Sequence, residues 1–157
     1  MHALGCCLLL ASAFSAHAAQ IKSVKVFAQG SDVNATAPDS ITVGKDSVWI
    51  AYTNGADSTG AGGSSTVAEY DHSGKVRATY TIAGSVDGLK IDPRTGLVWA
   101  LQNQDGNSTL TVIDPVTGIT PETTYAVKSA VHGYDDVVFT DSQVFLSYTN
   151  PSGPSER

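Results

Sequence analysis

The sequence predicts an all-β protein, a β-propeller made of four-stranded antiparallel blades. Two observations predict this fold: short apolar segments recur in a fixed order, and the first of them returns every 48 residues. The composition agrees, because charged residues make up only 15% of the 157 residues, while Gly, Ser, Thr and Val are plentiful. Such a mixture suits short strands joined by tight turns and fits a helical bundle poorly.

The N-terminus is expected to be a signal peptide, residues 1–18. An apolar run from Ala3 to Phe14 is too short to span a bilayer and precedes Ala16-His17-Ala18, the small-x-small pattern of a signal-peptidase site. No Lys or Arg precedes the run, which departs from the usual pattern. Both cysteines, Cys6 and Cys7, lie inside this segment. We therefore expect an exported protein, periplasmic or extracellular, whose mature domain, residues 20–157, has neither a cysteine nor a membrane anchor.

The innermost strand of each blade is predicted from three aligned segments. Each begins with Asp and continues with apolar or β-branched residues: Asp39 to Val43, Asp87 to Ile91 and Asp135 to Phe139. These three segments predict blades at about residues 39–86, 87–134 and 135–157, and the last blade is incomplete. A β-sandwich is the alternative, but a sandwich does not repeat its strand pattern at a fixed spacing.

The other strands follow from the same alignment. Second strands are predicted at 48–52, 98–101 and 144–148, third strands at 65–71 and 108–114, and fourth strands at 78–82 and 123–127. Trp49 and Trp99 occupy the same place in the second strand, so we expect them to pack between neighbouring blades.

Turn chemistry separates these segments. Asp92-Pro-Arg-Thr-Gly96, Asp71-His-Ser-Gly74 and Asp114-Pro-Val-Thr-Gly118 each combine an Asp with a Gly several positions later. Asp accepts local backbone hydrogen bonds and Gly takes the position with positive φ. These segments therefore predict hairpin turns and antiparallel sheets.

A further strand, Ile21 to Phe27, is expected to complete the last blade of the ring. With it the sequence supplies one closing strand and about two and a half blades, whereas closed propellers have about four to eight. We expect an incomplete ring that belongs to a longer chain; assembly of several chains into one ring is the alternative.

Several of these residues resemble secreted bacterial propellers of the NHL and YVTN-repeat kind. Ile113 to Gly118 and Tyr52-Thr-Asn54 carry the YVTN likeness, and Val86 to Asp92 followed by Leu97 to Ala100 resembles the gluconolactonase and luciferin-regenerating enzyme family. In that family an Asp-Gly or Asn-Gly dipeptide opens the innermost strand, and its Asp or Asn can bind a divalent metal. The resemblance implies a metal-binding role for Asp87.

Loop positions predict a binding face independently of that resemblance. In an antiparallel meander the connections into the first strand and those between the second and third strands lie at one end. The residues expected at this end are Asp39, Asp87, Asp135, Asp136, Asn54, Asn103 and His132. Their oxygen atoms suit Ca²⁺ or Mg²⁺, with Asp39, Asp87 and Asp135 as the candidate metal ligands.

A structural role for the same acids is the competing interpretation, in which each Asp bonds the backbone of its own turn. The Asp135-Asp136 pair favours a cation, because adjacent acids repel each other. Their side chains would nevertheless point to opposite faces of a strand. His132 is either a general base beside the acids or a plain loop residue.

Composition and motifs narrow the function. A net charge of −6 with scattered Lys and Arg excludes a nucleic-acid partner. No nucleophile elbow or phosphate-binding loop occurs, so the sequence does not decide whether catalysis takes place. The first hypothesis is a binding module for a small polar molecule, a glycan or a protein. The alternatives are a divalent-metal lactonase or related hydrolase and a truncated product without activity.

Overall fold

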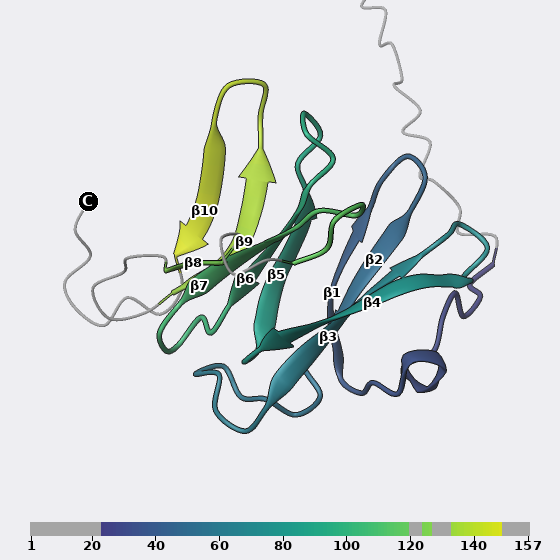
Figure 1. Ribbon diagram of the computed structural model, residues 1–157, viewed down its shortest axis with the longest axis horizontal. Helices are drawn as coiled ribbons and strands as arrows, with labels where there is room; N and C mark the ends of the chain where they lie inside the picture. The colour runs from purple at the N-terminus through teal and green to yellow at the C-terminus, as the bar shows by residue number, and fades with distance from the viewer. Residues whose placement is uncertain (1–22, 120–123, 127–132, 149–157) are drawn as a thin grey trace, which may run out of the picture.

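The computed structural model describes residues 23–119, 124–126 and 133–148, and within them the chain is all-β. Three antiparallel sheets lie side by side, two of four strands and one of two (Figure 1). Their elements are η1 (Gly30–Val33), β1 (Pro38–Val43), β2 (Val48–Tyr52), β3 (Ser64–Tyr70), β4 (Val76–Ala83), β5 (Val86–Ile91), β6 (Val98–Gln102), β7 (Thr109–Ile113), β8 (Thr124–Ala126), β9 (Tyr134–Phe139) and β10 (Val144–Tyr148).

Each sheet is a meander in which strands pair in chain order. Sheet 1 has the order β1-β2-β3-β4, sheet 2 the order β5-β6-β7-β8, and β9 pairs with β10 in a hairpin. The first strands of the three sheets begin at Pro38, Val86 and Tyr134, which are 48 residues apart. All ten strands lie within one or two residues of the positions that the aligned segments predict. The predicted all-β class and antiparallel pairing are therefore confirmed.

The hairpin turns have the predicted chemistry. In the β5–β6 turn, Asp92 Oδ1 accepts a hydrogen bond from the Arg94 backbone N–H at 3.0 Å. Asp71 accepts one from the Ser73 N–H at 2.8 Å, and Asp114 one from the Val116 N–H at 2.8 Å. Gly96 closes the first of these turns with a φ of +77°, a value that a side chain disfavours. Each turn is thus stabilised by hydrogen bonds within a few residues of its Asp.

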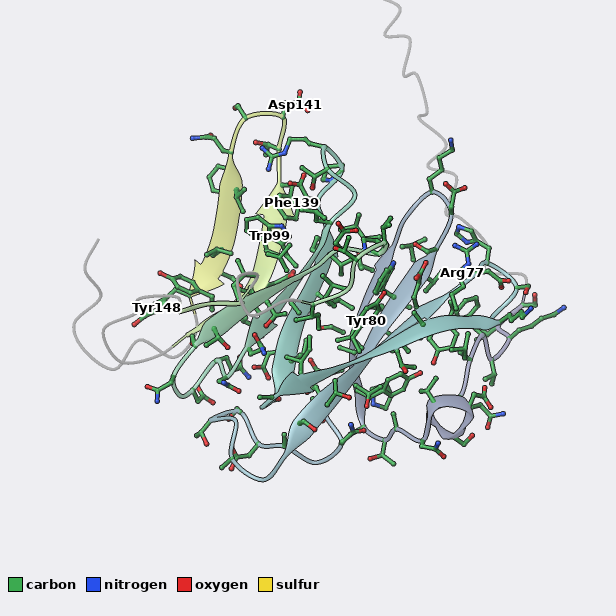
Figure 2. All side chains as sticks on the ribbon, in the orientation of Figure 1. Arg77, Tyr80, Trp99, Phe139, Asp141 and Tyr148 are labelled. Atoms are coloured by element: carbon green, nitrogen blue, oxygen red, sulfur yellow. The ribbon has the colours of Figure 1, made fainter. Side chains whose placement is uncertain are left out.

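The main core lies between sheets 1 and 2. Trp49, Ala51 and Val67 of sheet 1 pack against apolar residues of sheet 2, and Trp49 is only 1% exposed. Tyr80 stacks on Trp49 with ring centroids 5.6 Å apart. On the other side of sheet 2, Trp99 meets Phe139 of β9 edge to face at 5.0 Å (Figure 2). Both tryptophans therefore pack between neighbouring sheets, as expected.

The prediction of a strand at Ile21 to Phe27 is wrong over the part that the structure describes. Residues 23–27 form no strand, and Val24 and Val26 are 88% and 79% exposed. A strand requires a neighbour to take its backbone hydrogen bonds, and no described strand pairs with this segment. Phe27 instead places its ring edge-on against Tyr70 at 5.9 Å. The predicted signal peptide, residues 1–18, lies outside the described residues.

Candidate functional site

The first strands bring three predicted site residues together. Asp39 is the second residue of β1, Asp87 of β5 and Asp135 of β9. β5 lies between β1 and β9 and contacts both. The Ser40 hydroxyl donates to the Asp87 carbonyl at 2.7 Å, and the carbonyl of Asp135 lies where a side chain at Gly88 would be. The acids consequently influence one another electrostatically.

Asp87 has a strongly perturbed carboxyl group. Burial raises its pKa to about 6, and the negative charges of Asp39 and Asp135 act in the same direction. Two hydrogen bonds oppose this rise: Gln104 N–H donates to Oδ2 at 3.1 Å, and the Ser85 hydroxyl donates to Oδ1 at 3.0 Å. Asp87 therefore ties the start of β5 to the loop that follows β6, whereas the structural role considered from the sequence was a hydrogen bond to the backbone of its own turn.

The other acids differ in exposure, and Asp39 and Asp136 are exposed. Burial also raises the pKa of Asp39; the Ser40 hydroxyl lowers it and the charge of Asp135 raises it. Asp135 is half-buried, whereas Asp136 is exposed and accepts a hydrogen bond from the Val137 N–H at 2.8 Å. The adjacent pair thus differs in exposure, in agreement with opposite faces of β9. His132 lies outside the described residues.

Asn54 and Asn103 use their amide groups within the fold. Both adopt a left-handed backbone, with φ of +55° and +59°, within two residues of the end of the second strand of their sheets. Asn54 Oδ1 accepts from the Thr36 N–H at 3.0 Å, and Asn103 Oδ1 accepts from the Ser85 N–H at 3.0 Å. Each Asn therefore joins the end of a second strand to the connection that enters the first strand. The sequence showed that Asn recurs at this position, but it did not predict these hydrogen bonds.

A cleft of about 460 Å³ opens between sheets 1 and 2 at the same end of the strands. The β2–β3 loop, the β4–β5 connection and the β6–β7 loop surround it. Its lining consists of Thr59, Gly60, Gly63, Thr81, Ile82, Ala83, Gly84, Gln102, Asn103, Asn107, Thr109, Thr111 and Ile119. Not one of these residues carries a charge.

Hydrogen bonds hold the polar wall of this cleft in place. The buried Gln102 Oε1 accepts from the hydroxyls of Thr109 and Thr111 at 3.0 and 2.9 Å, and its Nε2 donates to the Ala83 carbonyl at 3.2 Å. Asn103 Nδ2 donates to the Asn107 carbonyl at 3.3 Å. Side chains at Gly60 or Gly84 would collide with the Asn103 amide. The two glycines thus let the loops close around Asn103.

A second cleft of about 660 Å³ lies at the opposite end of the two sheets, and sequence reasoning missed it. Its lining includes charged residues of both signs: Lys45, Asp46, Glu69, Arg77, Lys90 and Asp92. Glu69 pairs with Arg77 at 3.4 Å, and Asp92 pairs with Arg94 at 2.9 Å. Part of the charge around this second cleft is therefore already neutralised within the fold.

The described residues do not supply the ligand set that a metal needs. No group of three or more His, Cys, Asp or Glu side chains among them is arranged to hold an ion. Both carboxyl oxygens of Asp87 already accept hydrogen bonds, one from the Ser85 hydroxyl and one from the Gln104 N–H. The expectation of bound Ca²⁺ or Mg²⁺ thus gains no support from this arrangement.

No protein-family model, curated protein or solved structure matches the chain. Over the described residues, no helix is long and apolar enough to cross a membrane. The functional argument therefore depends on the geometry of the site.

Proposed function

We propose that this chain is an exported β-propeller binding module that recognises a neutral polyhydroxylated ligand, such as a glycan, on its loop face. The observation that carries the proposal is the cleft of about 460 Å³ between sheets 1 and 2. Clefts of this size, formed where loops meet on a rigid scaffold, are the usual places for small ligands.

The sheet arrangement supports the propeller part of the proposal. Two four-stranded meanders and one hairpin follow one another along the chain, and their first strands are neighbours. In a propeller the first strand of each blade lines the central channel, so the acids of β1, β5 and β9 would surround its mouth.

The chemistry of the lining supports a neutral ligand. Hydroxyl and amide groups of Thr, Asn and Gln line the cleft, together with backbone at Gly60, Gly63 and Gly84. A phosphate or carboxylate would find no compensating charge there, and burying an unpaired charge is costly. Sugar hydroxyls, in contrast, both donate and accept hydrogen bonds, as the lining groups do.

Ligand-observed saturation-transfer NMR with a panel of neutral mono-, di- and oligosaccharides tests this proposal. We expect at least one sugar to receive saturation from the protein, and Asn107→Trp to remove the signal by filling the cleft. Asn107 is exposed and its backbone carbonyl, which accepts from Asn103, survives the substitution. Ser142→Trp, on the exposed β9–β10 turn, is the matched control.

Two results would contradict the proposal. One is the absence of saturation transfer to every sugar of the panel by a folded protein. The other is a signal that Asn107→Trp and Ser142→Trp weaken equally, because binding would then lie outside the cleft.

The metal-dependent lactonase is the second candidate, and the proximity of Asp39, Asp87 and Asp135 is the observation in its favour. Burial raises the pKa of Asp87, the charges of Asp39 and Asp135 add to this rise, and a cation would relieve their repulsion. Thermal unfolding after chelation, with and without added Ca²⁺, tests it. A binding ion must raise the melting temperature through linkage, and an unchanged transition would count against a metal at these acids.

A further inference from the structure

Two exposed asparagines stand in the acceptor sequence for N-linked glycans, which is Asn-x-Ser or Asn-x-Thr with any residue except Pro between. The first is Asn34-Ala35-Thr36, directly after η1, and the second is Asn107-Ser108-Thr109, between β6 and β7. An Asp lies two residues before each Asn. One segment precedes a first strand and the other separates a second strand from a third, so the 48-residue repeat does not explain the shared pattern.

Asn34 presents a free side-chain amide. It is the exposed C-cap of η1 and has a left-handed backbone, with φ of +54° and ψ of +38°, which Asn adopts more readily than most residues. Among the described residues, neither the Asn34 amide nor the hydroxyl of the exposed Thr36 has a hydrogen-bond partner. The acceptor amide and the hydroxyl that define the sequence are therefore both open to solvent.

The segment around Asn34 is held mainly by its backbone. η1 contains no buried residue, and the Thr36 N–H donates to Asn54 Oδ1 at 3.0 Å. Ala35, which is 4% exposed, packs in a small core cluster with Tyr52. Segments with few buried side chains open locally at low cost in free energy. This segment can thus adapt to an enzyme without the loss of a sheet.

The Asn107 segment, in contrast, is tied into sheet 2. Thr109 is the first residue of β7, which pairs with β8, and its hydroxyl donates to Gln102 Oε1 at 3.0 Å. The Asn107 carbonyl accepts a hydrogen bond from Asn103 Nδ2 at 3.3 Å. An enzyme that engages this segment would first have to break these hydrogen bonds.

We propose that Asn34 is an acceptor for N-linked glycosylation and that the folded chain presents Asn34 but withholds Asn107. In the reaction, Asn34 Nδ2 forms a bond to C1 of the first sugar of a lipid-linked oligosaccharide. The bond from C1 to the lipid pyrophosphate breaks, and the pyrophosphate leaves with the electron pair. The amide gives up one proton to a base of the transferase.

This inference rests on the proposed export, because oligosaccharyltransferases modify chains that cross a membrane. It also bears on the cleft between sheets 1 and 2. Asn107 lines that cleft, whereas Asn34 and Thr36 do not. A glycan on Asn34 would therefore leave the cleft open to a ligand, and a glycan on Asn107 would obstruct it.

Glycosylation of the purified, folded chain in vitro tests the inference. The probe is a bacterial oligosaccharyltransferase with its lipid-linked oligosaccharide, since this class of enzyme recognises an acidic residue two positions before the Asn. Mass spectrometry of tryptic peptides measures the occupancy of each site. We expect at least about tenfold higher occupancy at Asn34 than at Asn107, because modification of Asn107 must first break hydrogen bonds of the fold.

Substitutions assign the product to its site. Asn34→Gln should remove the main product, and Asn107→Gln should retain it. Thr36→Ala should also remove the product, because it deletes the free hydroxyl but keeps the backbone bond to Asn54. Thr36→Ser, which retains a hydroxyl, is the matched control and should keep the product. Circular dichroism checks that each variant is folded.

Synthetic peptides of residues 29–38 and 102–111 separate the effect of the sequence from that of the fold, and we expect both to be modified. Any of four results would overturn the inference. The first two are an unmodified 29–38 peptide and a folded chain that is not modified at Asn34 although this peptide is. The third is equal occupancy of Asn34 and Asn107 in the folded chain. The fourth is an unmodified 102–111 peptide, because the selectivity would then not come from the fold.

These outcomes are independent of the proposed function. The reaction uses purified protein, so a failed export does not change its result. It also measures a covalent product on Asn34, so the absence of sugar binding in the cleft does not change it either.

Discussion

The aspartates of the turns and the aspartates at the start of the first strands have opposite electrostatic environments. In the turns, Asp92 accepts hydrogen bonds from the Arg94 side chain and backbone, and these lower its pKa. Hydrogen bonds from the hydroxyl and backbone N–H of Thr59 lower the pKa of Asp57. Those from the hydroxyl and backbone N–H of Ser73 lower the pKa of Asp71. In the first strands, burial raises the pKa of Asp39 and Asp87.

This difference shows that one residue type serves two purposes in a recurring unit. The turn acids are stabilised as anions and fix the hairpins. The first-strand acids crowd together where three sheets meet, and the ionisation of Asp39 and Asp87 opposes folding. Substitutions in the two groups should therefore have opposite dependences on pH.

The largest effect is expected for Asp92→Ala. Asp92 is 3% exposed, and its two oxygens accept from Arg94 Nε at 2.9 Å and Arg94 Nη2 at 3.1 Å. Arg94 in turn lies over the Phe139 ring at 5.7 Å, so this turn also supports the hairpin. Losing hydrogen bonds to a charged group should cost about 1–3 kcal/mol of unfolding free energy at neutral pH. Urea unfolding measures this loss.

The pH dependence identifies the cause of that loss. Since the pKa of Asp92 is lowered on folding, its contribution is present above the ordinary Asp pKa and disappears as pH falls through the folded value. The difference between wild type and variant should therefore shrink in acid. Asp141→Ala, on the exposed β9–β10 turn labelled in Figure 2, is the control. A difference of constant size at all pH values would mean that packing, not charge, explains the effect.

A smaller effect of opposite sign is expected for Asp87→Asn. Because the pKa of Asp87 is raised to about 6, the folded protein binds more protons than the unfolded chain between the ordinary Asp pKa of about 3.8 and 6. Wild-type stability should fall as pH rises through this window, and the variant should lack that fall. Melting temperatures across the window measure it. Identical pH profiles for the two proteins would show that Asp87 ionises normally.

The smallest effect is expected for Asp136→Asn. Asp136 neighbours Asp135 in the sequence, but its side chain is exposed. Substitutions at such surface positions usually change stability by less than about 0.5 kcal/mol. Urea unfolding beside Asp87→Asn checks this, and a loss as large as that of Asp92→Ala would show that the fold stabilises Asp136 as an anion, as it does the turn acids.

The strands and turns were predictable because their signals are local. The apolar segments at 87–91 and 98–101 became β5 and β6, and Asp92 and Gly96 form the turn between them. The segment from Ile21 to Phe27 has similar composition, yet its described part is not a strand. A strand depends on a partner for its backbone groups, and composition does not reveal whether one is present.

The candidate site was predictable only in its position. The repeat placed Asp39, Asp87 and Asp135 in equivalent strands, and the structure brings those strands together. The roles of Asn54 and Asn103 were not foreseeable, because their partners Thr36 and Ser85 are 18 residues away in the chain. The uncharged lining of the cleft likewise combines residues from β4 of one sheet with residues from β6 and β7 of the next.

The sequence by itself determined the order of the strands, the hairpin turns and the 48-residue spacing of the first strands, since periodicity and turn residues act over a few positions. The tertiary structure alone decided the raised pKa of Asp87 and the cleft between sheets 1 and 2. Each of these properties depends on how much solvent a neighbouring sheet removes, and that neighbour lies tens of residues away along the chain.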